Sequence, residues 1–145
     1  MFNPIAQNEY HVGFTGTRDG MSVKQKFFLR KSLEEVVKKN AKTTLYFHHG
    51  DCIGADAEAH DIAEGLGFEI VIHPPDEPGL RAFKKAAIIL PEDLYLKRNR
   101  DIVDSSHIVL GCPKERKNVV RSGTWATIRY ARNKKKLWKI IRPLV

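Results

Sequence analysis

The amino-acid sequence predicts a three-layer α/β fold, in which a mostly parallel sheet of about five strands carries helices on both faces. Strand-like segments alternate with helix-like segments along the whole chain, and glycine or proline marks most of the boundaries. Parallel neighbours need a crossover connection, which the intervening helices supply. We expect one domain over residues 1–145, because each half alone would bury too small a core.

The first half of the chain supplies three predicted strands and two predicted helices. YHVGFTG (10–16), TTLYFHH (43–49) and FEIVIHPP (68–75) are the strands, the last of them ended by prolines. Residues 22–40 form the first helix, with Ser22 as its N-cap. Its apolar stripe consists of Phe27, Leu29, Leu33, Val36 and Val37. GADAEAHDIAEGLG (54–67) is the second helix, closed by glycines.

The second half continues the alternation. Residues 80–87 are predicted to be helical after the loop DEPG, and PEDLYLKRNRDIVDSS (91–106) forms the next helix. HIVLGCP (107–113) is a strand, SGTWATIRYARNKK (122–135) a helix, and KLWKIIRP (136–143) the last strand. Short connections and the usual handedness favour a doubly wound, Rossmann-like order of strands.

The segments that follow the strands predict a ligand site. TGTRDG, HHGDCIGAD, GCPKERK and RSGT all come after strands, and ligands of open parallel sheets bind beyond the carboxyl ends of the strands. Glycines there allow close backbone approach, hydroxyls donate to phosphate oxygens, and two of the segments enter helices whose free N–H groups favour an anion. The predicted ligand-binding residues are Gly13, Thr15, Gly16, Thr17, Arg18, His49, Gly50, Asp51, Gly54, Ala55, Asp56, Arg98, Asn99, Arg121, Ser122, Gly123, Thr124 and Trp125.

The stretch HHGDCIGADAEAH (48–60) resembles a metal site, but we predict neither a metal nor another cofactor. Asp56 and His60 share a helix face, whereas His48 and His49 point to opposite faces of a strand, and no recognised metal-binding spacing such as HExxH is present. Asp56 has a simpler role in the first turn of a helix, where a carboxylate caps free N–H groups. Two cysteines are too few for a disulfide framework or for a thiolate metal site.

Four motifs occur in an order that resembles the superfamily of the bacterial DNA-processing protein A and the Lonely Guy phosphoribohydrolases, also called SLOG. They are VGFTGTR (12–18), GADAEAH (54–60), KRNRDI (97–102) and RSGTWAT (121–127). The resemblance implies a Rossmann-like pocket for nucleotides or related phosphorylated ligands and, in the DNA-processing branch, for single-stranded DNA. Pairing of two copies through helices is implied by the resemblance alone.

The resemblance departs from the phosphoribohydrolases at the carboxylate that cleaves the N-glycosidic bond. Alignment of Gly123 and Thr124 with their PGGxGTxxE motif places Thr127 where the glutamate stands, and a threonine cannot stabilise a developing ribosyl cation or activate water as a carboxylate does. Hydrolysis therefore requires a carboxylate from elsewhere. Four other acids could supply it, although exposed helix faces are the better explanation for each of them: Glu58, Glu92, Asp93 and Asp101.

Three functions follow from these observations. We favour a protein that binds, and thereby senses or sequesters, a phosphorylated nucleoside; the alternatives are a nucleoside-phosphate N-glycosidase and a single-stranded nucleic-acid binder. The net charge of +8, much of it in KERK and RNKKKLWK, fits any of these anionic partners, although Lys134 to Lys136 also suit a solvated helix end. MFNPIAQNEY lacks the features of a secretory signal and no apolar run reaches ~20 residues, so we expect a cytoplasmic protein without a membrane partner.

Overall fold

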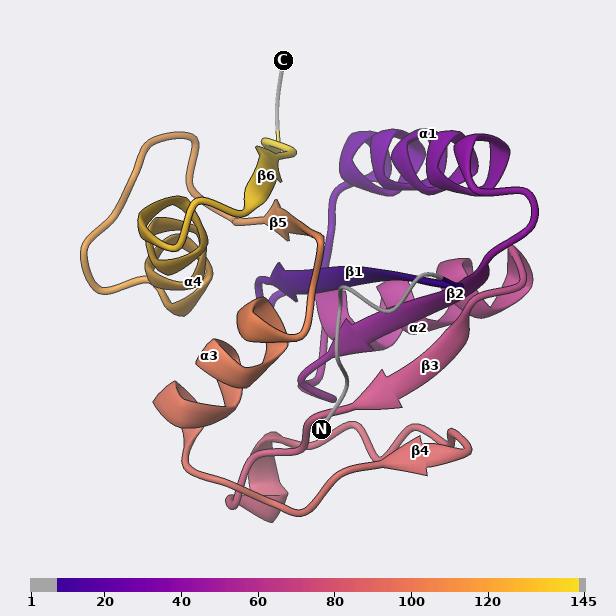
Figure 1. Cartoon of the computed structure of the whole chain (residues 1–145). Helices are drawn as coiled ribbons and strands as arrows, with labels where there is room; N and C mark the ends of the chain where they lie inside the picture. Colours follow the sequence, from indigo (N-terminus) through magenta and orange to yellow (C-terminus); the bar gives the residue numbers. More distant parts are fainter. Residues whose placement is uncertain (1–7, 144–145) are drawn as a thin grey trace.

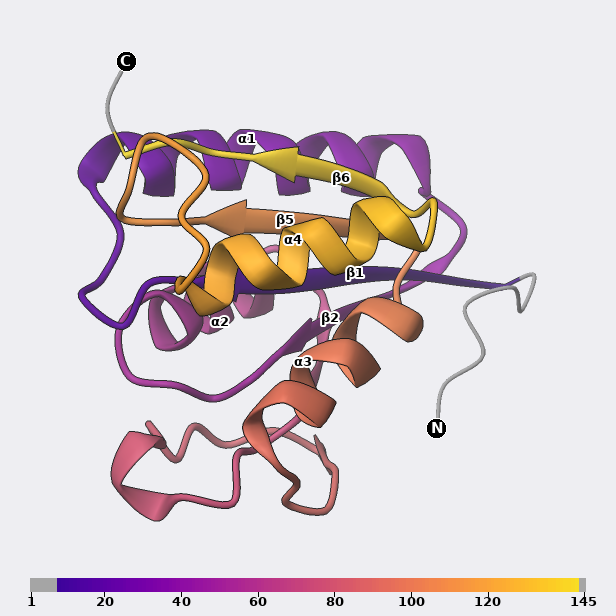
Figure 2. The same cartoon turned by 90° about the vertical axis from the view of Figure 1, so that its left-hand side faces the viewer.

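The computed structural model describes residues 8–143 and has three layers (Figure 1). Six parallel strands form one sheet in the order β4-β3-β2-β1-β5-β6. Helices α3 and α4 lie on one face, and α1 and α2 lie on the other (Figure 2). No helix in this part of the chain is long and apolar enough to cross a membrane. The elements are β1 (Glu9–Gly16), α1 (Val23–Lys39), β2 (Thr44–His49), α2 (Ala55–Gly65), β3 (Glu69–Ile72), a 3-10 turn η1 (Pro78–Leu80), β4 (Ile88–Ile89), α3 (Tyr95–Asp104), β5 (Ile108–Cys112), α4 (Gly123–Asn133) and β6 (Leu137–Ile140).

The predicted fold class is confirmed, with two corrections. The sheet has six strands rather than about five, because the two-residue strand β4 adds to β3. The helix predicted over residues 80–87 is wrong. Asp51 holds this segment away from the helical form: its C=O accepts the N–H of Ala82, and its carboxylate accepts from Arg81 Nε (3.1 Å) and from the N–H of Lys84 (3.0 Å).

Helix α1 begins as the sequence predicts. The Ser22 hydroxyl accepts the N–H of Gln25, and the Gln25 side chain accepts the N–H of Ser22, which completes a capping box. The predicted apolar stripe is only partly right. Leu29 and Leu33 are fully buried, but Phe27 is 53% exposed, and the buried position one turn before Leu29 is Gln25. The Gln25 amide donates to backbone carbonyls of the later loops, so a polar residue occupies part of the inner face.

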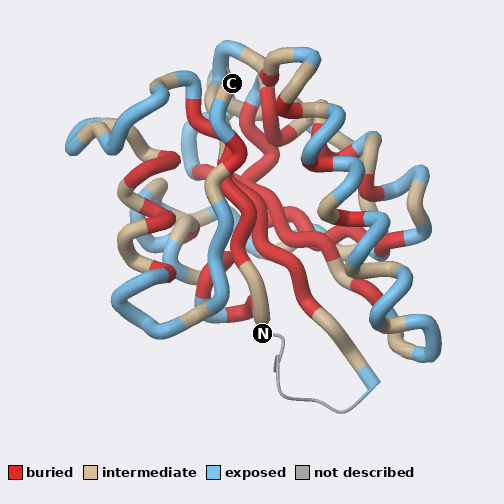
Figure 3. The backbone as a smooth tube through the Cα atoms, turned by 90° about the horizontal axis from the view of Figure 1, so that it is seen from above, coloured by how far each residue is buried: buried red, intermediate tan, exposed pale blue. Residues whose placement is uncertain are grey.

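The two faces of the sheet are packed differently. The face toward α1 and α2 carries a core of sixteen buried residues, among them Phe14, Phe47 and Ile72. The cluster toward α4 has only four buried members, Val103, Val109, Ile128 and Ala131. The central strands are buried on both sides (Figure 3), so polar side chains must fill much of the space beneath α3.

A chain of histidines crosses that polar space. Glu9 Oε1 lies 3.0 Å from Nε2 of His11, Nδ1 of His11 lies 2.7 Å from Nε2 of His48, and Nδ1 of His48 lies 2.8 Å from Nε2 of His73. The three rings belong to β1, β2 and the residue after β3, and each is at most 3% exposed. Burial lowers the pKa of His48 well below its usual value and that of His73 to about 3, so these imidazoles are neutral at pH 7.

Candidate functional site

A cavity of about 550 Å³ lies where β1 adjoins β5 and the chain order of the strands reverses. The loop after β1, the loop after β2, and the first turns of α3 and α4 surround it. This is the position at which open parallel sheets bind their ligands.

The structure brings twelve of the eighteen predicted residues around this cavity. They are Thr15, Gly16, Thr17, Arg18, Gly50, Asp56, Arg98, Asn99, Arg121, Ser122, Gly123 and Thr124. Six others do not line it: Gly13, His49, Asp51, Gly54, Ala55 and Trp125. The sequence reasoning also missed lining residues, chiefly Cys52, Tyr95, Lys114 and Glu115. Each carried a usable signal: Cys52 lies in HHGDCIGAD, Lys114 and Glu115 lie in GCPKERK, and Tyr95 lies one helical turn before Arg98.

The N-terminus of α4 presents backbone donors to the cavity. Ser122 caps the helix by accepting the N–H of Trp125 (3.2 Å). The N–H groups of Gly123 and Thr124 belong to the same first turn, where an α-helix has no internal acceptor for them, and both residues line the cavity. Together with the helix dipole they favour an anionic group.

The N-terminus of α2 does not offer free N–H groups to an anion, contrary to the sequence prediction. The N–H of Ala55 donates to the C=O of Thr17 (2.9 Å), and Asp56 and Glu58 place carboxylates in the first turn. Protein groups therefore already complement this helix end.

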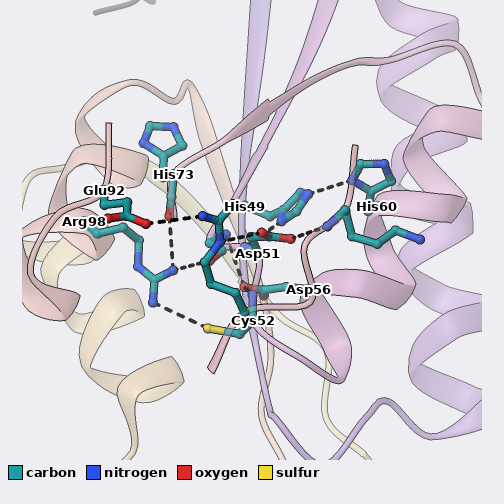
Figure 4. A network of polar contacts seen from close by, with 11 residues as sticks. His49, Asp51, Cys52, Asp56, His60, His73, Glu92 and Arg98 are labelled. Atoms are coloured by element: carbon teal, nitrogen blue, oxygen red, sulfur yellow. Dashed lines mark hydrogen bonds and ion pairs between the residues drawn. The ribbon is translucent and has the colours of Figure 1, made fainter. Parts of the chain in front are cut away.

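Arg98 is the central side chain of the site. It is 2% exposed and lies against both the cavity and the loop after β2 (Figure 4). Nη1 donates to the C=O groups of Gly50 and His73, and Nη2 lies 3.6 Å from Sγ of Cys52. Within residues 8–143 its acceptors are thus carbonyl oxygens and a sulfur rather than a carboxylate, and its Nε has no acceptor. The guanidinium charge is buried without a hydrogen-bonded counterion.

Asp56 lies on the other side of Gly50 and is 5% exposed. Its Oδ2 accepts the N–H groups of Gly50 (3.1 Å) and Cys52 (3.2 Å). Burial raises the pKa of this carboxyl to about 6, against the opposing effects of the Arg98 charge and the two backbone donors. Asp56 therefore exchanges a proton close to neutral pH.

Tyr95 connects the two arginines of the site. The guanidinium of Arg18 lies 5.4 Å from the centroid of the Tyr95 ring, and that of Arg98 lies 5.1 Å from it. Two cations on one aromatic ring form favourable contacts without neutralising either charge. Arg100, two residues after Arg98, is exposed and packs over Tyr130 instead, so only one of the two arginines predicted on this helix faces the cavity.

The glycines of the site make room for protein atoms. A Cβ on Gly50 would lie 1.9 Å from Nη1 of Arg98, and one on Gly54 would lie 2.3 Å from the carbonyl oxygen of Arg18. The same holds for Gly13, Gly16 and Gly123, which abut Ser106, Ala55 and Tyr95. Protein packing therefore requires glycine at each of these positions, and their role toward a ligand stays a prediction.

Replacement of Gly54 by alanine is expected to lower the free energy of unfolding by about 2–4 kcal/mol, because Gly54 combines a φ of 88° with backbone contact that leaves no room for a methyl group. Urea unfolding followed by circular dichroism measures this loss. Gly67→Ala is the matched control, since Gly67 has a φ of 93° but open space around it, and should cost about 1 kcal/mol. Equal losses in the two variants would contradict the steric argument.

The three histidines of the stretch 48–60 all have hydrogen-bond partners within the protein. His48 and His49 point to opposite faces, as predicted: His48 joins the chain of histidines, and Nε2 of His49 lies 2.9 Å from Nδ1 of His60. The N–H of Asp51 donates to Nδ1 of His49, so His49 carries its proton on Nε2 and donates to His60. Within residues 8–143 no three His, Cys, Asp or Glu side chains gather in a way that could hold a metal ion.

The carboxylates weighed for hydrolysis lie elsewhere. Glu58 accepts the N–H of Met21, Glu92 pairs with Arg81, and Asp93 and Asp101 both bind Lys97. Thr127 donates to the C=O of Gly123 (2.8 Å). The acids that line the cavity are Asp19, Asp56 and Glu115, of which Asp56 alone is buried.

Comparison with known proteins supports the fold. No protein-family model matches the chain, and no curated protein sequence matches it. A molybdenum cofactor binding protein from Rippkaea orientalis has a similar structure, with a TM-score of 0.72 and 15% identity over 94% of this chain and 78% of that one. A Moco carrier protein from Chlamydomonas reinhardtii is also similar, with a TM-score of 0.63 and 16% identity over 92% of this chain and 76% of that one. At this level of identity the likeness establishes a shared Rossmann-like fold.

Proposed function

We propose that the protein binds a small phosphorylated ligand, a nucleotide or a nucleotide-derived compound, in the cavity between α3 and α4, and acts as a sensor or sequestering protein. The order of the four sequence motifs supports placing it in the SLOG superfamily. The structural neighbours are named for binding the molybdenum cofactor, which is consistent with a small-molecule ligand at this edge of the sheet.

The observation that carries the proposal is the buried guanidinium of Arg98. A buried charge without a hydrogen-bonded counterion is costly, and the cost is offset when an anion enters the cavity. Arg18 and Arg121 add positive charge to the same walls, whereas the charge of Lys114 is paired with Asp19 (3.3 Å). The first turn of α4 adds backbone N–H donors. This donor set suits the oxygens of a phosphate group.

A thermal-shift panel at 50 and 500 mM NaCl tests the proposal. The panel contains nucleoside mono- and diphosphates, ADP-ribose, cyclic dinucleotides, the molybdenum cofactor and a twenty-nucleotide oligothymidylate. A ligand at ~100 times its dissociation constant stabilises the folded state by about 2.7 kcal/mol. We expect a shift from one small phosphorylated class that persists at high salt. A shift from the oligonucleotide alone, abolished by salt, would instead favour nucleic-acid binding, because release of counterions makes such binding strongly salt-dependent.

Asp56 favours a second candidate function, cleavage of an N-glycosidic bond in the bound nucleoside phosphate. It is a buried carboxyl beside the cavity with a pKa of about 6, which suits proton transfer near neutral pH. In this function Asp56 takes the role for which Thr127 is unsuitable.

Under this second function, Asp56→Asn is expected to reduce release of free base at least about 100-fold, because general acid–base catalysis contributes roughly that factor, while ligand affinity changes little. Chromatography of the products after incubation with each nucleoside monophosphate measures the release. Glu58→Gln is the control, since Glu58 follows on the same helix but does not line the cavity. Absence of base release from the unmodified protein would leave binding as the function.

A further inference from the structure

Strand β6 forms one edge of the sheet, and within residues 8–143 no further strand pairs with its outer side. Among the described residues it pairs with β5 alone. The N–H of Ile141, directly after β6, donates to the C=O of Gly111 on β5 (2.8 Å). Successive residues of a strand alternate in direction, so the backbone groups of Trp138 and Ile140 face the outer edge. Figure 2 shows β6 along this border, with α1 behind it and α4 in front.

The side chains of β6 expose apolar surface on both sides of the edge. Leu137 is 65% exposed and Trp138 is 42% exposed, and adjacent residues of a strand point to opposite faces. Lysine often protects an edge strand from pairing. The single lysine of β6, Lys139, is bound to Ser32 of α1 (3.0 Å), which places its ammonium group over the helix-covered face rather than across the edge.

The excess positive charge of the protein lies in the last thirty residues of the sequence, which include β6. Residues 116–145 contain ten Lys and Arg and no Asp or Glu, whereas residues 1–115 contain fifteen Lys and Arg and seventeen Asp and Glu. The last thirty residues therefore carry a formal charge of +10 and the first 115 carry −2, which together give +8. Lys134, Lys135 and Lys136 immediately precede β6, and Arg142 follows it with its Nε bound to the C=O of Arg116 (3.0 Å).

We propose that the free edge of β6 docks an extended acidic segment of a partner protein, which joins the sheet as a seventh strand. The edge offers backbone N–H and C=O groups in alternation, and a polypeptide strand satisfies both kinds. Phosphate oxygens of a nucleic acid or a lipid head group only accept hydrogen bonds, so they would leave the carbonyl groups unpaired. Acidic side chains complement the flanking lysines, and apolar side chains cover Leu137 and Trp138.

This docking surface is independent of the ligand cavity, because none of the residues of β6 lines the cavity. Failure of one proposal therefore does not affect the other. A binding assay with a peptide tests the edge, whereas the thermal-shift panel of small ligands tests the cavity.

The test uses a fluorescein-labelled ten-residue peptide in which Asp or Glu alternates with Val or Ile, added to the full chain. We expect binding at micromolar concentrations that weakens at least about tenfold between 50 and 300 mM NaCl. In the complex, the amides of Trp138 and Ile140 should become protected from hydrogen exchange. Polyglutamate, which has the charge without the apolar alternation, and a peptide with Lys in place of the acids should bind at least tenfold more weakly.

Paired variants separate strand addition from charge attraction. Trp138→Pro and Trp138→Ala both remove the ring, but only proline removes the outward N–H, so we expect Trp138→Pro to bind at least tenfold more weakly than Trp138→Ala. Far-UV circular dichroism confirms that both are folded. Lys134→Gln with Lys136→Gln should weaken binding, whereas Lys38→Gln with Lys39→Gln, an equal change of charge at the end of α1, should not.

Several results would overturn the proposal. One is no binding of the peptide at 200 μM, a concentration that corresponds to a binding free energy of about 5 kcal/mol. Others are binding that leaves the amides of Trp138 and Ile140 unprotected, or polyglutamate binding as tightly as the peptide. A further one is protection of the same amides by a twenty-nucleotide oligothymidylate. The last result would assign the surface to nucleic acid instead.

Discussion

Lowering the pH from 7.5 to 5.0 is expected to reduce the free energy of unfolding by about 4 kcal/mol, which is a large part of the 5–15 kcal/mol typical of a single domain. The cause is the group of buried imidazoles. Desolvation lowers the pKa values of His48 and His49 well below their usual value, and that of His73 to about 3.

The free energy of unfolding falls as the pH falls because the unfolded chain binds more protons than the folded state. Below about pH 6.5, unfolding allows each of these three histidines to take up a proton that burial disfavours in the folded state, and each proton so excluded is worth about 1.4 kcal/mol per pH unit. Their stabilising contribution is complete above pH 6.5 and declines below it. Asp56 acts in the opposite sense, because its folded-state pKa of about 6 lies above the ordinary 3.8, and it offsets roughly one of the three protons.

Urea unfolding at a series of pH values between 7.5 and 5.0 measures this slope. His73→Gln removes one of the protons taken up on unfolding and should reduce the slope by about 1.4 kcal/mol per pH unit. Equal stability of the unmodified protein at the two ends of the series would show that the buried imidazoles are already charged in the folded state.

Replacement of Arg98 by methionine is expected to weaken binding of the phosphorylated ligand at least about 100-fold, or roughly 2.7 kcal/mol, because the ligand loses the charged donor buried beside its cavity. Methionine retains much of the apolar stem of arginine, so the change removes mainly the guanidinium. The pKa of Asp56 should rise further, since the charge of Arg98 lowers it in the unmodified protein.

Isothermal titration calorimetry with the ligand identified by the thermal-shift panel measures the loss. Arg100→Met is the matched control, because it removes the same charge from the same helix at an exposed position outside the cavity. Similar losses of affinity in both variants would mean that Arg98 contributes only through the overall positive charge of the protein.

The sequence predicted the layers and most elements, because local patterns determine them. Ser22 caps α1, as the residues that follow it predict, whereas Ser122, which was predicted to bind the ligand, caps α4. Helical geometry predicts that Arg98 and Arg100 diverge, so that only one of them faces the site, and the structure shows that this one is Arg98.

The remaining features depend on contacts between distant segments. Asp51 fixes the segment around Arg81 from thirty positions away, and Tyr95 reaches the first turn of α4. The glycines after β1 and β2 are typical of phosphate-binding loops, yet their immediate neighbours are protein atoms. Sequence position cannot distinguish a glycine that admits a ligand from one that admits an arginine.

The polar filling beneath α3 has a consequence for motion. Helices that rest on histidine, serine and arginine side chains gain less from burial than helices that rest on hydrocarbon, so local opening should require less free energy for α3 than for α1. Amides of α3 should accordingly exchange with deuterium before those of α1. Because α3 carries Tyr95, Arg98 and Asn99, an occupied cavity should slow that exchange. The bound ligand would then stabilise the helix that forms one wall of its own cavity.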